Sequence, residues 1–195
     1  MENENLNLYE QRKETVSSFI KDKEYRPMRV KDIAAFLQVP SNEIQLLYDI
    51  IDELIEEGKI VETKKGKIVA SESLHQYPGT FTGNSRGFGF VSIEGMENEV
   101  FIPANATNGA MHKDKVICRI INKTDRGAEG EIVKVLSHGM KHIVGTYQKG
   151  KNFGFVIPDD KKICDDIYIG PGDNLGAVDG HKVLVKITKA PTEKD

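Results

Sequence analysis

The chain has 195 residues, and its 27 Lys and Arg against 30 Asp and Glu give a formal net charge of −3. Hydrophobic residues make up 38 % and charged residues 29 %, which is ordinary for a globular protein. No apolar run approaches the roughly 18 residues of a membrane span, which excludes a transmembrane class, and the acidic balance argues against a binder that depends on bulk attraction to polyanions.

The first 70 residues predict a small helical domain that ends in a β-hairpin. Apolar residues recur at helical spacing within 16–20, 33–37 and 44–55. Ser41 is a candidate N-cap for the third helix and Gly58 a stop signal. Short β-prone runs on both sides of residues 64–66 predict the hairpin. Three helices followed by a hairpin are the order of a winged helix, so residues 1–70 are interpreted as a winged-helix-like domain.

The predicted third helix, 41–57, is unsuited to DNA because it contains six acidic residues and no Lys or Arg. Such a surface repels phosphates. The basic residues of this domain gather in the hairpin as Lys64, Lys65 and Lys67. They are candidates for contact with RNA backbone; docking of the domain on a protein partner and a simply solvated hairpin are the alternatives.

The rest of the chain predicts short strands separated by Gly, Asn, Asp and Pro, and it contains an internal repeat. GTF at 79–81 recurs as GTY at 145–147, GFGFV at 87–91 as NFGFV at 152–156, and VFI at 100–102 as IYI at 167–169. The offset stays between 65 and 67 residues. One β domain is therefore expected twice, at 71–137 and at 138–195.

Aromatic residues at alternate positions predict a base-stacking face in each copy. Phe88 and Phe90 share one face of a strand because the side-chain period is two, and Phe101 on a neighbouring strand can lie beside them. Three such rings form a platform on which unpaired bases stack. The second copy repeats the platform, and each copy has a basic flank, so the candidate RNA-binding residues are Phe88, Phe90, Phe101 and Arg86, and Phe153, Phe155, Tyr168 and Lys151.

The alternative for these rings is a place in the barrel core, which is the more frequent role of alternating Phe residues on a strand. Gly89 and Gly154 separate the aromatic residues and leave the opposite face without bulk. The same pattern also occurs twice with the same basic flank. These features favour the platform.

The motifs resemble a known family. RGFGFV at 86–91 with EVFIP at 99–103, and KNFGFV at 151–156 with DIYIG at 166–170, resemble the paired RNA-binding motifs of cold-shock domains, which are five-stranded OB-fold barrels. A winged-helix-like domain followed by two such barrels resembles the N-terminal part of bacterial ribonuclease R, a processive 3′-to-5′ exoribonuclease. The resemblance covers nearly the whole chain and implies an α+β multidomain protein.

The resemblance also implies what to expect of chemistry on this chain. In the family, a later domain holds magnesium with clustered aspartates, so we expect no catalytic residue, no metal site and no cofactor here. The pairs Asp159-Asp160 and Asp165-Asp166 lie at strand ends and in a loop, where solvated turn carboxylates are favoured over metal ligands.

The second copy is expected to lack a strand. Residues 116–121 and 130–136 predict the fourth and fifth strands of the first copy, whereas the counterpart of Gly130 in the second copy would fall beyond Asp195. We therefore expect a second OB barrel without its fifth strand, in a chain that is a fragment.

Two functions stay open at this point. One is single-stranded RNA capture for a ribonuclease R-like exoribonuclease; the other is a free-standing RNA chaperone or regulator of the cold-shock type. Single-stranded DNA is a further candidate partner because stacking does not sense the 2′-hydroxyl. The N-terminus is unlike a signal peptide, and Cys118 and Cys164 show no zinc spacing and are expected to be reduced thiols, so we expect a cytoplasmic protein. We also expect a monomer with no membrane partner.

Overall fold

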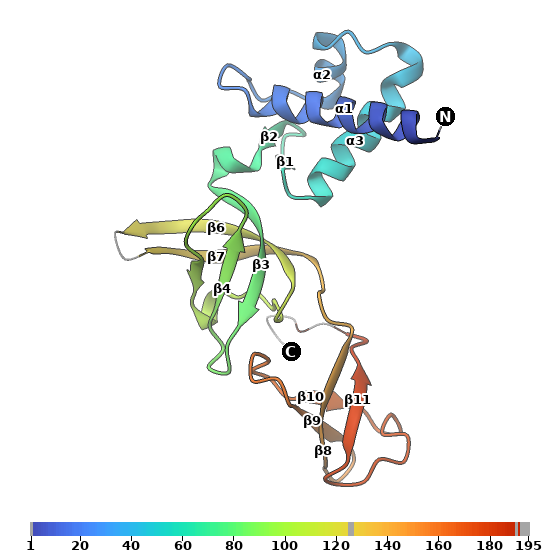
Figure 1. The fold of residues 1–195 in the computed structure, drawn as a ribbon, viewed down its shortest axis with the longest axis vertical. Helices are drawn as coiled ribbons and strands as arrows, with labels where there is room; N and C mark the ends of the chain where they lie inside the picture. The colour runs from blue at the N-terminus through green and yellow to red at the C-terminus, as the bar shows by residue number, and fades with distance from the viewer. Residues whose placement is uncertain (1, 125–126, 190, 192–195) are drawn as a thin grey trace. The chain divides into compact units, whose positions relative to one another are not determined.

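The computed structural model describes residues 2–124, 127–189 and 191, and it divides the chain at Pro78 and Gly79 into two compact units. The first unit is mainly helical and the second is made of strands, as Figure 1 shows.

The first unit contains the three helices and the hairpin that the sequence predicts. They are α1 (Glu2–Lys21), α2 (Val30–Phe36), α3 (Ile44–Glu56) and the antiparallel pair β1 (Ile60–Glu62) and β2 (Ile68–Ala70). Gly58 follows α3 with a φ of +72°, which only glycine adopts readily. The predicted cap at Ser41 is wrong, because a 3-10 turn at Ser41–Glu43 precedes α3 and no side chain caps it. The winged-helix assignment stays a prediction.

Apolar side chains from all three helices and from the hairpin form the core of this unit. Its most buried members are Ile20, Ile33, Ile51, Leu54, Ile60 and Ile68. The buried stripe of α3 is narrower than its sequence predicts, because Ile44 and Tyr48 lie at its flank and are 37 % and 41 % exposed.

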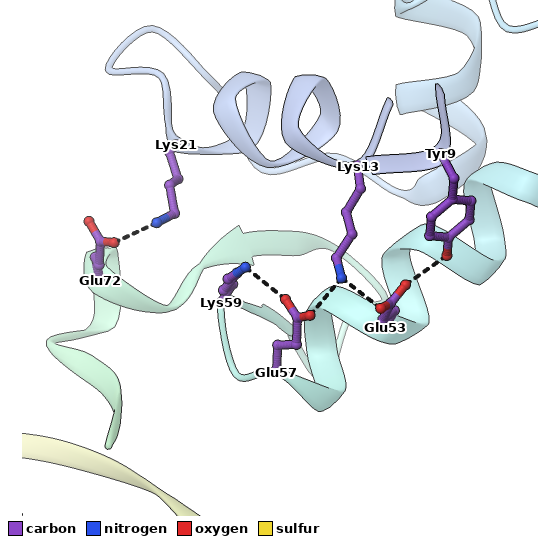
Figure 2. A network of polar contacts seen from close by, with 7 residues as sticks. All are labelled: Tyr9, Lys13, Lys21, Glu53, Glu57, Lys59 and Glu72. Atoms are coloured by element: carbon purple, nitrogen blue, oxygen red, sulfur yellow. Dashed lines mark hydrogen bonds and ion pairs between the residues drawn. The ribbon is translucent and has the colours of Figure 1, made fainter. Parts of the chain in front are cut away.

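A charged network ties α1 to α3 (Figure 2). The Lys13 ammonium lies 2.6 Å from a carboxylate oxygen of Glu53 and 2.6 Å from one of Glu57, and its side chain is only 8 % exposed. The Tyr9 hydroxyl donates to the other oxygen of Glu53 at 2.7 Å. A buried ammonium is costly without a partner, so its pairing with the two carboxylates stabilises the packing of the helices.

The network shifts the ionisation of its members. The hydrogen bonds from Lys13 and Tyr9 lower the pKa of Glu53, and the hydrogen bond to Glu53 raises the pKa of Tyr9 to about 12. Burial raises the pKa of Glu57, but the hydrogen bonds from Lys13 and Lys59 outweigh burial, so this pKa is also lowered. Groups with lowered pKa values stabilise the fold above their ordinary pKa of 4.5 and lose that effect as the pH falls through the lowered values.

Lys13→Met is therefore expected to lower the free energy of unfolding of the helical unit by about 1–3 kcal/mol at pH 7. The loss is smaller than for a fully buried pair, because Glu53 and Glu57 keep 39 % and 35 % of their side chains exposed. Urea unfolding followed by circular dichroism at pH 7 and pH 4 measures it. Lys21→Met removes an ion pair with Glu72 that is 38 % and 55 % exposed, and should cost less than about 1 kcal/mol. Equal losses in the two variants would contradict this role of Lys13.

The second unit begins with a closed barrel of five strands, which confirms the predicted OB-type fold. Its strands are β3 (Gln76–Gly83), β4 (Gly89–Ile93), β5 (Val100–Ile102), β6 (Lys115–Thr124) and β7 (Gly127–Ser137), in the spatial order β3-β4-β5-β7-β6. All pairs between successive strands in that order are antiparallel except β5 with β7, which is parallel. Val91, Val100, Ile102 and Val116 point inward and are 0 % exposed.

The second sheet repeats the first with four strands among the described residues. They are β8 (His142–Lys149), β9 (Gly154–Pro158), β10 (Ile167–Ile169) and β11 (Lys182–Lys186), in the order β10-β9-β8-β11. The register repeats as well, because Phe90 pairs with Phe101 in the barrel and Phe155 pairs with Tyr168 in this sheet. Strands β10 and β11 correspond to β5 and β6 of the first barrel, where β7 lies between β5 and β6 and pairs with both.

The glycine between the two aromatic residues of each repeat has a packing reason. A Cβ atom on Gly89 would lie 2.3 Å from the ring of Phe81, and one on Gly154 would lie 2.4 Å from the ring of Tyr147. Phe81 and Tyr147 occupy matching positions in the repeat and are 2 % and 4 % exposed. In both copies, therefore, a buried ring fills the space behind the glycine while the neighbouring aromatic residues point outward.

Candidate nucleic-acid interface

The first predicted platform is present as a triad of neighbouring rings. Phe88 lies 6.0 Å from Phe90 and 5.7 Å from Phe101 between ring centroids, and Phe90 lies 5.7 Å from Phe101. Phe90 and Phe101 are each 36 % exposed. Phe88 is half-buried and precedes β4 by one residue, so it belongs to the turn and not to the strand.

The second triad repeats this geometry. Phe153 lies 5.5 Å from Phe155 and 5.7 Å from Tyr168 between ring centroids, and Phe155 lies 5.9 Å from Tyr168. Phe153, Phe155 and Tyr168 are 43 %, 36 % and 58 % exposed. The structure therefore brings together all six aromatic residues that the sequence singled out, in two groups of three.

The rings lie on the outer face of their sheets. Burial alternates along β4, where Val91 and Ile93 point inward and Phe90 points outward. The rings of each triad meet at angles between 36° and 85°, so none of them covers a neighbour face to face. Open aromatic faces on a strand surface are suited to stacking with planar ligands such as unpaired bases.

The two predicted basic residues lie in the turns that lead into these strands. Arg86 is exposed, and its backbone N–H donates to the side-chain oxygen of Asn84 at 3.0 Å. Lys151 is exposed in the turn closed by a backbone hydrogen bond from Gly150 to Phe153 at 2.8 Å. Neither side chain forms an ion pair with another described residue, so both charges are available to a ligand.

The other reactive groups have local explanations. Within the part of the chain that the structure describes, no three His, Cys, Asp or Glu residues gather as they would around a metal ion. Cys118 and Cys164 are free thiols, and burial raises their pKa values to about 12 and about 11. Asp160 accepts a backbone hydrogen bond from Lys162 at 2.9 Å, as expected of a turn carboxylate. None of the described helices is long and apolar enough to cross a membrane.

Sequence reasoning missed the side chains that border the first platform. Thr82, Glu129 and Asn122 belong to the same transverse row of the barrel as Phe90 and Phe101. Only the register of the strands identifies these residues. Glu129 follows Phe101 by 28 residues in the sequence and lies on β7, the second strand of the long β6–β7 hairpin.

Comparison with known proteins shows what these domains are similar to. Residues 79–135 match the family model described as the ribonuclease B OB domain, and residues 155–195 match a cold shock domain. Ribonuclease R of Thermotoga maritima is 33 % identical over 184 residues, which are 93 % of this chain and 26 % of that protein. Ribonuclease R of Acidithiobacillus ferrooxidans is 27 % identical over 201 residues, which are 97 % of this chain and 46 % of that protein.

The chain spans about a quarter to about a half of the length of the two curated relatives named above. Among solved structures, the match to Mycoplasma genitalium RNase R in complex with ribose methylated single-stranded RNA covers 44 % of this chain and 14 % of that protein, at 16 % identity and a TM-score of 0.38. The two domain matches and the similarity over nearly the whole chain confirm the resemblance seen in the motifs and fit the N-terminal part of ribonuclease R.

Proposed function

We propose that this chain binds single-stranded RNA through its two aromatic platforms and serves as the RNA-capturing part of a ribonuclease R-like 3′-to-5′ exoribonuclease. The observation that carries the proposal is the repeated triad of outward-facing rings on matching strands. The names of the relatives support an RNA substrate for the protein to which such a region belongs.

Stacking supplies most of the affinity in this proposal. Each base that stacks on an aromatic side chain contributes roughly 1–3 kcal/mol. Arg86 and Lys151 add a positive charge at the edge of each platform, where they can contact the phosphates that flank a stacked base. The chain as a whole is acidic, so attraction to the RNA backbone is local to such residues.

The proposal assigns binding to this chain and cleavage to regions of the relatives outside the matched part. It includes no catalytic residue, magnesium or other cofactor on this chain. Of the carboxylates that the sequence offered, Asp160 accepts a turn hydrogen bond, Asp165 accepts from the Cys164 thiol and Asp159 pairs with Lys182. The free-standing chaperone is the less supported function, because the similarity to ribonuclease R extends over the helical unit as well as the barrels.

The helical unit has two proposed roles. Lys64, Lys65 and Lys67 are all exposed in the turn between β1 and β2, where they can contact RNA backbone as the wing of a winged helix. The acidic surface of α3 disfavours nucleic acid, and contact with a protein partner is the second role proposed for this unit.

Titration of the chain with a labelled single-stranded RNA and with the matching duplex, in the presence of magnesium, tests the proposal. We expect binding to the single strand, much weaker binding to the duplex, and no shortening of the RNA on a gel. A parallel titration with single-stranded DNA measures whether the 2′-hydroxyl contributes. Equal affinity for strand and duplex would contradict stacking, and shortened RNA would contradict the assignment of cleavage to other regions.

A further inference from the structure

A transverse row of outward-facing residues crosses all five strands of the first barrel. Thr82 on β3 pairs with Phe90 on β4, which pairs with Phe101 on β5. Phe101 pairs in parallel register with Glu129 on β7, and Glu129 pairs with Asn122 on β6. Paired residues lie on the same face of a sheet, and adjacent strands are about 4.7–4.9 Å apart. The row therefore places a carboxylate one strand from the platform and an amide one strand further.

Burial supports this orientation for Glu129, and the register with Glu129 places Asn122 on the same face. Glu129 and Asn122 are exposed, as are Phe90 and Phe101. Gly130, the next residue along β7, faces the interior, because a Cβ atom there would lie 2.9 Å from a side-chain carbon of Val100. A planar group stacked on Phe101 would thus have the Glu129 carboxylate beside its edge.

Glu129 differs from the next acidic residue of the same strand. Glu131 is held by an ion pair and a hydrogen bond with Arg119 on β6. Within the described residues, the carboxylate of Glu129 and the amide of Asn122 make no hydrogen bond or ion pair. Both groups keep their hydrogen-bonding capacity for a ligand that occupies the platform.

The position of this carboxylate determines which part of a nucleotide can face it. The Glu129 carboxylate would repel the phosphate backbone of a bound strand, so that backbone would run on the other side of the rings and the edge of the stacked base would point toward Glu129. An ionised carboxylate only accepts hydrogen bonds. At C4 of its pairing edge cytosine presents an amino group, which donates, whereas uracil presents a carbonyl oxygen at that position, and its one donor on this edge is the ring N3–H. The contrast therefore concerns the group at C4 that faces Glu129. The exposed pairing edges of unpaired bases are where proteins read RNA sequence.

We propose that Glu129 is a specificity-determining residue of the first platform, with Asn122 as a second contact, and that it favours cytosine over uracil in the base stacked on Phe101. This inference rests on the proposed function, because it requires that the platform binds single-stranded RNA.

The test compares oligocytidine and oligouridine of equal length at pH 7.5, by fluorescence anisotropy, with the full chain and with the same chain carrying Phe155→Ala, which weakens the second platform. We expect the full chain to bind oligocytidine roughly fivefold more tightly, the low end of discrimination by a good base contact. We expect Glu129→Gln to bring the ratio close to one, because the amide can turn to donate to uracil. Glu131→Gln, with the same charge change on the same strand, should leave the ratio unchanged.

The outcomes separate the inference from the function that it rests on. If neither RNA binds, the proposed function fails. If both RNAs bind equally to the unmodified chain, Glu129 does not distinguish the two bases. If Glu129→Gln raises both affinities by the same factor and leaves their ratio unchanged, Glu129 acts only as a repelling charge. In either case the base-reading role is overturned while RNA binding stands.

Discussion

Replacing Phe90 and Phe155 together with alanine is expected to weaken binding of single-stranded RNA at least thirtyfold. Each ring is 36 % exposed on the outer face of its sheet, and each pairs across the strands with another ring of its triad, Phe90 with Phe101 and Phe155 with Tyr168. Loss of one stacked base costs roughly 1–3 kcal/mol, so two independent losses amount to about 2–6 kcal/mol. Fluorescence anisotropy titration at fixed salt measures the change, and each single variant should show about half of it on a logarithmic scale.

Phe36→Ala is the matched control for this experiment. Phe36 is 65 % exposed and stacks on Phe19 in the helical unit, at 5.0 Å between ring centroids. Its loss removes an exposed ring without touching either platform, so RNA affinity should change less than twofold. Circular dichroism and thermal unfolding should show that all variants remain folded. Unchanged binding in the folded double variant would show that the triads do not bind RNA.

The platforms could be predicted from the sequence because their information is local. The period of two along a strand fixes that Phe90 and Gly89 face opposite ways, and the same arrangement occurs in both copies of the repeat. The hairpin and the stop at Gly58 are local signals of the same kind. Sequence patterns within five or six residues are therefore enough to predict the outward-facing rings without the structure of the barrel.

Features that depend on distant contacts could not be predicted in this way. Lys13 forms hydrogen bonds with Glu53 and Glu57, which follow it in the sequence by 40 and 44 residues. Glu129 lies beside Phe101 because β5 pairs in parallel with β7. Strand register is set by the packing of a whole barrel, and a shift of one residue would turn Glu129 to the inside. Local preference also misled at Ser41, where the chain forms a 3-10 turn before α3 begins.

Gly89→Ala is expected to destabilise the first barrel by about 1–3 kcal/mol or more. The new methyl group would lie 2.3 Å from the buried ring of Phe81 and 2.5 Å from the backbone oxygen of Thr82. The ring would have to leave its place in the core, and the backbone oxygen has no room to move without breaking the pairing of β3 with β4. Overpacking of a core typically costs this much. Urea unfolding followed by circular dichroism measures the loss.

The second copy and a surface glycine provide the comparison that tests this explanation. Gly154→Ala brings a methyl group to 2.4 Å from the ring of Tyr147, so it should destabilise the second sheet by the same mechanism. Gly95→Asn changes a turn glycine that has a φ of +80° and no atom within 4 Å of a new Cβ, and Asn tolerates that conformation. It should cost less than about 1 kcal/mol. A Gly89→Ala variant as stable as Gly95→Asn would mean that Phe81 can move aside and that the core does not require a glycine at this position.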